Sequence, residues 1–285
     1  MYFECHGHIF MNGNSYKDAM ELHKNGVVKP VIKDRLMALA KAGVKYYRDG
    51  GDILGASAYA RDIALEYGID YKTCIFATHK LNNYGWIVGH AFTDSKEFHK
   101  LVLRAKKEKA DFIKLMISGI MDFKTFGGLS GGGLELNEIP ELINIAHGEG
   151  FKIMTHTNGA DRIKAAIEAG ADSIEHGYFM DEDCISMLSQ SGTIWVPTLA
   201  ACAGFIGREG FTPGVAEQNL LHQKNNIRLA LKSGALIAAG SDAGAYGVDP
   251  VKGISLEYAL LKDAGMTQDD IDRGNREIVE RFKRI

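Results

Sequence analysis

The sequence has few cysteines and prolines, and it has no long apolar run. Only 4 of the 285 residues are cysteine and 5 are proline. The cysteines are scattered and form no C-x-x-C pair, which indicates reduced thiols packed as small hydrophobic side chains in a cytoplasmic protein. No apolar run is long enough to cross a bilayer, and no charged-then-apolar leader precedes the first strand, so we expect no membrane association.

A strong excess of charge of one sign is also missing. The net charge is −3 and the isoelectric point is about 6.4, which gives no support for a nucleic-acid or anionic-membrane partner. No G-x-G-x-x-G motif follows the first expected strand, which argues against a dinucleotide-binding open sheet. The glycine-rich stretch 127–133 is too long and irregular for a phosphate cradle, and we interpret it as part of an active-site loop.

What the sequence does contain is a regular alternation of short apolar runs with amphipathic stretches of helical length. The composition, 46% hydrophobic and 24% charged, is that of a globular protein with a large core. The alternation repeats roughly eight times in a chain close to the ~250 residues of a (β/α)₈ barrel. No linker or charge block divides the chain. We therefore predict a single TIM-barrel domain over residues 1–285. The expected strands are 1–8, 44–51, 69–79, 111–118, 151–156, 172–177, 193–198 and 235–242.

Potential metal ligands lie at the ends of these expected strands. His6 and His8 are two residues apart, so a strand places both imidazoles on one face. In a barrel the carboxyl ends of all strands open on one side, where further polar residues collect. These are Asp49, His79, Lys114, His156, His176 and Asp242. Imidazole nitrogens and a carboxylate around one opening are suitable ligands for a divalent metal ion.

The ordered set of motifs resembles the amidohydrolase superfamily, and its closest branch is the imidazolonepropionase/prolidase-like group. The motifs that carry the resemblance are His6-Gly7-His8, Phe112-Ile113-Lys114, Thr155-His156, Glu175-His176-Gly177 and Gly240-Ser241-Asp242, with support from Arg48-Asp49 and Gly89-His90. Relatives usually carry a small flanking β-sandwich, and the sequence shows none. The resemblance therefore predicts a barrel that is free-standing or covered by a partner subunit, and this favours a homo-oligomer.

The resemblance also implies a metal centre. His6 and His8 are expected to hold one metal with Asp242, and His156 and His176 a second. Lys114, carboxylated by carbon dioxide, is expected to bridge them, because a carbamate is an anionic oxygen donor whereas a free ammonium is not. Zinc is the expected metal, with manganese or iron also suited. If Lys114 is unmodified, a single metal on His6, His8, His156 and Asp242 is the alternative, with His176 as a substrate contact.

The implied activity is hydrolysis of a C–N bond in a small-molecule substrate, an acyl-amino acid or a dipeptide. Asp242 is expected to act as general acid and base toward a metal-activated water. His90 is a candidate for holding the scissile carbonyl, and Tyr178 for contacting substrate. Asp49 is interpreted as an ion-pair partner of Arg48 or as a residue that orients a ligand.

Two alternatives remain open at this point. The first is a mononuclear cyclic-amide hydrolase or a deaminase. Deaminases of this superfamily generally lack the strand-4 lysine and carry a glutamate soon after the strand-5 histidine, and the stretch 156–162 has no glutamate. The second is a catalytically silent barrel that only binds a ligand. Its expected signature is a missing ligand residue, and none is missing.

Overall fold

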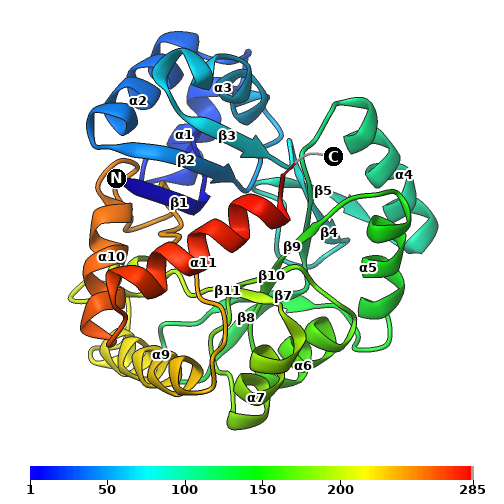
Figure 1. Cartoon of the computed structure of the whole chain (residues 1–285). Helices are drawn as coiled ribbons and strands as arrows, with labels where there is room; N and C mark the ends of the chain where they lie inside the picture. The colour runs from blue at the N-terminus through cyan, green and yellow to red at the C-terminus, as the bar shows by residue number, and fades with distance from the viewer. Residues whose placement is uncertain (284–285) are drawn as a thin grey trace.

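The computed structural model describes residues 1–283, and in it helices surround a set of mostly parallel strands (Figure 1). The strands are β1 (Tyr2–Gly7), β2 (Val44–Asp49), β3 (Asp70–Thr73), β4 (Ala77–Lys80), β5 (Gly89–Phe92), β6 (Ile113–Met116), β7 (Ser118–Met121), β8 (Leu129–Gly133), β9 (Ile153–Thr157), β10 (Ser173–His176) and β11 (Ile194–Val196). The α-helices are α1 (Tyr16–His23), α2 (Lys29–Lys41), α3 (Ala56–Ala64), α4 (Ser95–Lys107), α5 (Ile139–Gly148), α6 (Ala160–Glu168), α7 (Glu182–Ser191), α8 (Leu199–Ala203), α9 (Val215–Lys232), α10 (Gly253–Asp263) and α11 (Gln268–Arg281), and a short 3₁₀ helix covers Leu65–Tyr67.

The strands form two parallel sheets and one hairpin. One sheet has the order β1-β2-β3, and the other has the order β11-β10-β9-β6-β4-β5. Isolated parallel bridges join Gly7 to Ala243 and Trp195 to Ile237, so the segment 237–243 touches both sheets. This arrangement is a TIM-barrel-like α/β fold, as the alternation in the sequence predicted.

Two expected elements differ in the structure. The stretch 69–79 is not one strand, because β3 ends at Thr73 and β4 begins at Ala77. Between them Ile75 adopts a left-handed backbone conformation with φ of 67°, which a β-branched residue rarely does and which no strand accommodates. The stretch 235–242 forms one isolated bridge, at Ile237, in place of a strand, and a second bridge follows at Ala243.

The glycine-rich stretch is more ordered than a plain loop. It includes β8, which forms an antiparallel hairpin with β7, so that Ser118 pairs with Gly133 and Met121 with Leu129. Helix α1 also lies in a segment that the sequence pattern left unassigned, and Ser15 caps its N-terminus by accepting a hydrogen bond from the Asp18 amide. The charged residues 276–281 form the C-terminal part of α11, which begins with a capping box between Thr267 and Asp270.

Two buried apolar clusters support this framework. The larger one lies between strands and surrounding helices. The smaller one joins strand residues such as Tyr46 and Met154 to Ile278 of α11 and to Phe282, which follows this helix. Figure 1 shows α11 lying across the strands. All four cysteines are free and buried, as expected for small hydrophobic side chains. Within residues 1–283, the structure contains no helix of the length and apolarity needed to cross a membrane.

Candidate metal centre

One cavity of about 640 Å³ collects most of the residues that the sequence singled out, although Asp49 and His79 do not line it. Those that line it are His6, His8, Lys114, His156, His176, Tyr178 and Asp242. His6, Lys114, His156 and His176 lie on β1, β6, β9 and β10. His8 and Tyr178 lie just after β1 and β10, and Asp242 lies in the segment 237–243. His90 is not among them: it lies on β5, and its ring meets Phe76 edge-on at 4.8 Å between centroids. The structure therefore gives no support for His90 as a holder of the scissile carbonyl.

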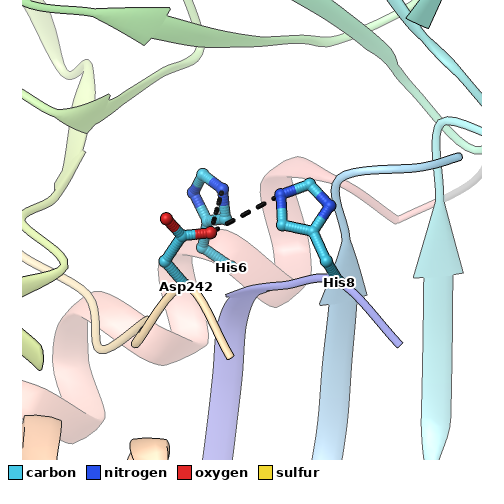
Figure 2. A group of neighbouring side chains, drawn as sticks. All are labelled: His6, His8 and Asp242. Atoms are coloured by element: carbon cyan, nitrogen blue, oxygen red, sulfur yellow. Dashed lines mark ion pairs between the residues drawn. The ribbon is translucent and has the colours of Figure 1, made fainter. Parts of the chain in front are cut away.

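The tightest group in the cavity is formed by His6, His8 and Asp242, whose ligand atoms all lie within 4.8 Å of one another. Figure 2 shows the two rings side by side above β1, with the Asp242 carboxylate facing both. The Oδ1 atom of Asp242 is 3.6 Å from Nε2 of His6 and 3.5 Å from Nε2 of His8. Two ligands bound about 2.1 Å from a tetrahedral zinc ion are separated by about 3.4 Å. The three side chains therefore fit a divalent metal ion.

Hydrogen bonds fix the orientation of these two imidazoles. Nδ1 of His6 donates to Oε2 of Glu175 at 2.7 Å, and Nδ1 of His8 faces the Gly51 carbonyl at 3.4 Å. With the proton on Nδ1, each ring keeps the lone pair of Nε2 for the cavity. Carboxylate or carbonyl partners of this kind orient histidine ligands in metal sites.

His156 and His176 form a second pair, with ring centroids 4.5 Å apart. Nε2 of His156 donates to the Gly119 carbonyl at 3.1 Å, which leaves the lone pair on Nδ1. Nδ1 of His176 lies 2.7 Å from Oγ1 of Thr198, and in the tautomer in which Nδ1 donates to this hydroxyl the lone pair is on Nε2. Neither of these lone-pair nitrogens accepts a hydrogen bond from the described residues. The pair thus presents two further nitrogen donors beside the first group.

Lys114 lies between the histidines. Its Nζ is 3.1 Å from Nε2 of His6 and 3.4 Å from Nε2 of His8, and the side chain is buried. Burial lowers the pKa of the Lys114 amine, although the Asp242 carboxylate acts in the opposite direction. The space beside the amine depends on Gly50, because a Cβ at that position would lie 2.5 Å from Nζ and overlap the His8 ring. A buried amine with open space beside it fits the carboxylation that the resemblance implies.

The electrostatics of the cavity favour neutral imidazoles. Burial, with the Lys114 ammonium as a further cause, holds the pKa values of His6 and His8 well below their usual range and lowers the pKa of His156 to about 3. Burial raises the pKa of the Asp242 carboxyl to about 6, with Lys114 acting against it. Neutral histidine is the form that binds a metal.

Backbone strain is concentrated at this site. His176, Thr198 and Asp242 have φ values of 65°, 49° and 61°, in the left-handed region that non-glycine residues seldom occupy. Such conformations persist only where the surrounding structure enforces them, and they gather at functional sites. Thr198 shows how they are enforced here, since its carbonyl accepts a hydrogen bond from the Tyr178 hydroxyl at 3.0 Å.

Sequence reasoning did not identify Glu175 as the residue that orients His6. Glu175 also pairs with the fully buried Arg48, whose Nη2 is 2.7 Å from Oε1 of Glu175. Asp49 is therefore not the partner of Arg48. It accepts hydrogen bonds from the amides of Ile9 and Gly51 and thereby ties the loop after β1 to β2. The Glu-His-Gly motif was a signal for Glu175, but its partner could only be found from the fold.

Tyr84 was also missed. It lies in the loop between β4 and β5, lines the cavity, and places its ring 5.2 Å from that of His156. Its backbone amide donates to the Gly131 carbonyl, which attaches this loop to the β7–β8 hairpin. Burial, together with the charge of Asp242, raises the pKa of the Tyr84 hydroxyl. The hydroxyl forms no hydrogen bond with the described residues, so it is available to a ligand.

The comparison with family models gives the class of this protein. The model of the amidohydrolase family matches residues 3–271. The chain therefore belongs to the amidohydrolase family, as the motifs at the strand ends indicated.

The sequence identity to individual relatives is low. An uncharacterised protein of Mycobacterium tuberculosis is 31% identical over 138 residues, covering 44% of this chain and 35% of its own. Ochratoxinase of Aspergillus niger is 26% identical over 241 residues, covering 76% of this chain and 48% of its own. The chain thus spans about a third to a half of the length of these curated relatives. A solved Xaa-Pro dipeptidase has a TM-score of 0.78 at 21% identity, covering 99% of this chain and 75% of its own, which shows a shared fold.

Proposed function

We propose that this protein is a metal-dependent hydrolase of amide C–N bonds, acting on small acyl-amino acids or dipeptides. The observation that carries the proposal is the set of neutral nitrogen donors and one carboxylate around the buried amine of Lys114. Family membership, together with the likeness to a dipeptidase fold and to ochratoxinase, supports amide hydrolysis over other reactions.

In this proposal His6, His8 and Asp242 would hold one metal, His156 and His176 would hold a second, and a carboxylated Lys114 would be a ligand of both. Zinc is the expected metal, since all the donors are nitrogen or oxygen atoms and four of them come from imidazole. A divalent metal, when bound, polarises a carbonyl oxygen and makes water more acidic. We also propose that the scaffold of this centre is a single domain whose eight strands close into a barrel.

The remaining chemistry belongs to side chains of the cavity. Asp242 takes the proton from the attacking water and delivers it to the departing amine nitrogen. Tyr84 donates its free hydroxyl to the scissile carbonyl, the role first considered for His90. Tyr178 lines the cavity, but its hydroxyl is already bound to Thr198, so it holds Thr198 in place and contacts substrate only through its ring.

The first test is metal content. Protein produced with added zinc should retain more than one equivalent of metal by elemental analysis, and hydrolysis of an amide library should disappear with a chelator and return with metal. His6→Ala should bind less metal because it removes a donor. His99→Ala is the matched control, since His99 pairs with Glu149 near the surface and should leave metal content unchanged. Wild-type protein with far less than one equivalent, even after reconstitution, would contradict the proposal.

A second test concerns Thr198, which orients His176. Thr198→Val keeps the branched shape but removes the Oγ1 partner of Nδ1. Loss of such an orienting hydrogen bond typically weakens metal affinity about 10- to 100-fold, and we expect a loss of this size in competition with a chelator. Thr193→Val is the matched control, because its hydroxyl binds the Ala171 carbonyl outside the cavity. Equal metal affinity of Thr198→Val and the wild type would show that the His176–Thr198 contact does not serve the metal.

A further inference from the structure

Four aromatic side chains form one side of the cavity, which we term the aromatic wall: Phe123, Phe205, Phe211 and Tyr246. Phe123 and Phe205 are stacked with centroids 3.7 Å apart and an interplanar angle of 13°. Phe211 meets Phe205 edge-on at 4.9 Å, and Tyr246 lies 5.4 Å from Phe205. The four rings are therefore one connected cluster, built from three separate loops.

The loops that carry the aromatic wall are attached to one another through their backbones. The Thr212 amide donates to the Phe123 carbonyl at 3.2 Å, and the Gly247 amide donates to the Gly13 carbonyl at 2.8 Å. Gly204 and Gly247 approach so closely that a Cβ on either would lie 2.7 Å from the carbonyl oxygen of the other. These contacts hold the rings in place before any ligand arrives, as in most small-molecule sites.

The rest of the cavity outside the metal centre is also largely apolar. Met11, Ile87, Val88, Met116 and Met121 line it together with the aromatic wall. Polar side chains such as Lys17, Asp122 and Asn158 also line the cavity, but a polar substituent placed against the apolar side chains would lose hydration without gaining hydrogen bonds, which is unfavourable. A flat apolar group would instead gain both burial and ring contacts.

We propose that the substrate is an amide with an aromatic ring on one side of the scissile bond, and that the aromatic wall binds this ring. The inference rests on the proposed amide hydrolysis and adds the substrate class to it. The wall lines the same cavity as Asp242 and His176, so a ring in contact with it and an amide at the metal centre fit within one bound molecule.

The catalytic test compares three acyl-amino acids on the metal-loaded protein. N-acetylphenylalanine and N-phenylacetylglycine carry a phenyl ring on opposite sides of the amide, and N-acetylglycine carries none. Burial of a phenyl group is expected to raise kcat/KM of at least one ring-bearing amide about 10- to 100-fold over N-acetylglycine.

The binding test needs no catalysis. The ratio of the dissociation constants of propionate and 3-phenylpropionate, measured by calorimetry, isolates the phenyl group because both ligands have the same carboxylate. We expect a ratio of about 10 to 100 for the wild type. Phe205→Leu and Tyr246→Leu should each lower it about 2- to 10-fold, since they remove ring contacts but keep an apolar side chain. Tyr246 is 43% exposed, so its substitution should leave the fold intact.

Phe126→Leu is the matched control. Phe126 lies with Phe123 in the connection between β7 and β8, but its ring is exposed and does not line the cavity. It should leave the ratio unchanged. The inference would be overturned by a wild-type ratio near one, or by a ratio that decreases equally in Phe126→Leu and Phe205→Leu. If N-acetylglycine is hydrolysed with the same kcat/KM as the ring-bearing amides, the inference fails and the proposed function stands. If no amide is hydrolysed, the proposed function fails, and the binding ratio still decides whether the wall binds a ring.

Discussion

Asp242→Asn is expected to lower kcat by about 10²- to 10⁴-fold, because it removes the group that we propose to move the proton. The substitution should leave the backbone undisturbed. Asp242 has a left-handed φ of 61°, and asparagine tolerates that region at least as well as aspartate. The backbone hydrogen bond from the Asp242 amide to the His6 carbonyl does not depend on the carboxylate.

Asp249→Asn is the matched control for Asp242. It lies in the following loop, where its carboxylate caps the amides of Val251 and Lys252, and it does not line the cavity. Turnover should be measured at saturating metal, with metal content determined on the same samples, so that loss of proton transfer is separated from loss of metal. Near-native kcat in metal-loaded Asp242→Asn would show that another residue moves the proton.

The positions of the candidate ligands followed from sequence, because each lies at or near the end of an apolar strand. The apolar runs predicted the strands that carry these residues. Because the carboxyl ends of barrel strands open on one side, His6, Lys114, His156 and His176 were expected at one opening. That inference required no knowledge of side-chain contacts. The eighth strand formed only isolated bridges, yet Asp242 still reached the cavity because the bridge from Gly7 to Ala243 holds its neighbour against β1.

Residues that act through another residue could not be found in this way. Arg48 reaches Glu175 across the fold, and nothing in the local sequence of either predicts the pair. Gly50 matters because its missing Cβ leaves room beside Lys114. This depends on how the segment after β2 packs against β6, which the local sequence of neither segment shows. His90 is a case in which the sequence motif did not show where the side chain lies. Gly89 and His90 lie on β5, and the His90 ring packs on Phe76 and does not line the cavity.

Lys114→Met is expected to lose the second metal preferentially, because it removes the proposed carbamate bridge while keeping a side chain of similar length. Lys45→Met is the matched control, since Lys45 is an exposed lysine on β2 that does not line the cavity. Metal content should fall toward one equivalent in Lys114→Met and remain at the wild-type value in Lys45→Met. Activity should fall with the second metal, because paired metals clamp both sides of the reacting group.

The carbamate itself makes a separate prediction. Its formation needs a neutral amine and carbon dioxide, and the buried position of Lys114 favours the neutral amine. Reactivation of metal-free protein should therefore depend on bicarbonate as well as on metal. A crystal structure with metal retained should show three additional atoms on the Lys114 amine, and the metals should lie about 3.5–4 Å apart.

Chemical rescue distinguishes a missing carboxylate from a damaged fold. Acetate or propionate added to Lys114→Ala should restore part of the activity, because the vacated space accepts a carboxylate in the place of the carbamate. The same acids should give no increase in Asp242→Asn, where the bridge is intact. If Lys114 is unmodified in a metal-loaded crystal and Lys114→Met retains activity, the centre is mononuclear. The chain would then lie closer to the imidazolone-hydrolysing members of the family than to the dipeptide-cleaving ones.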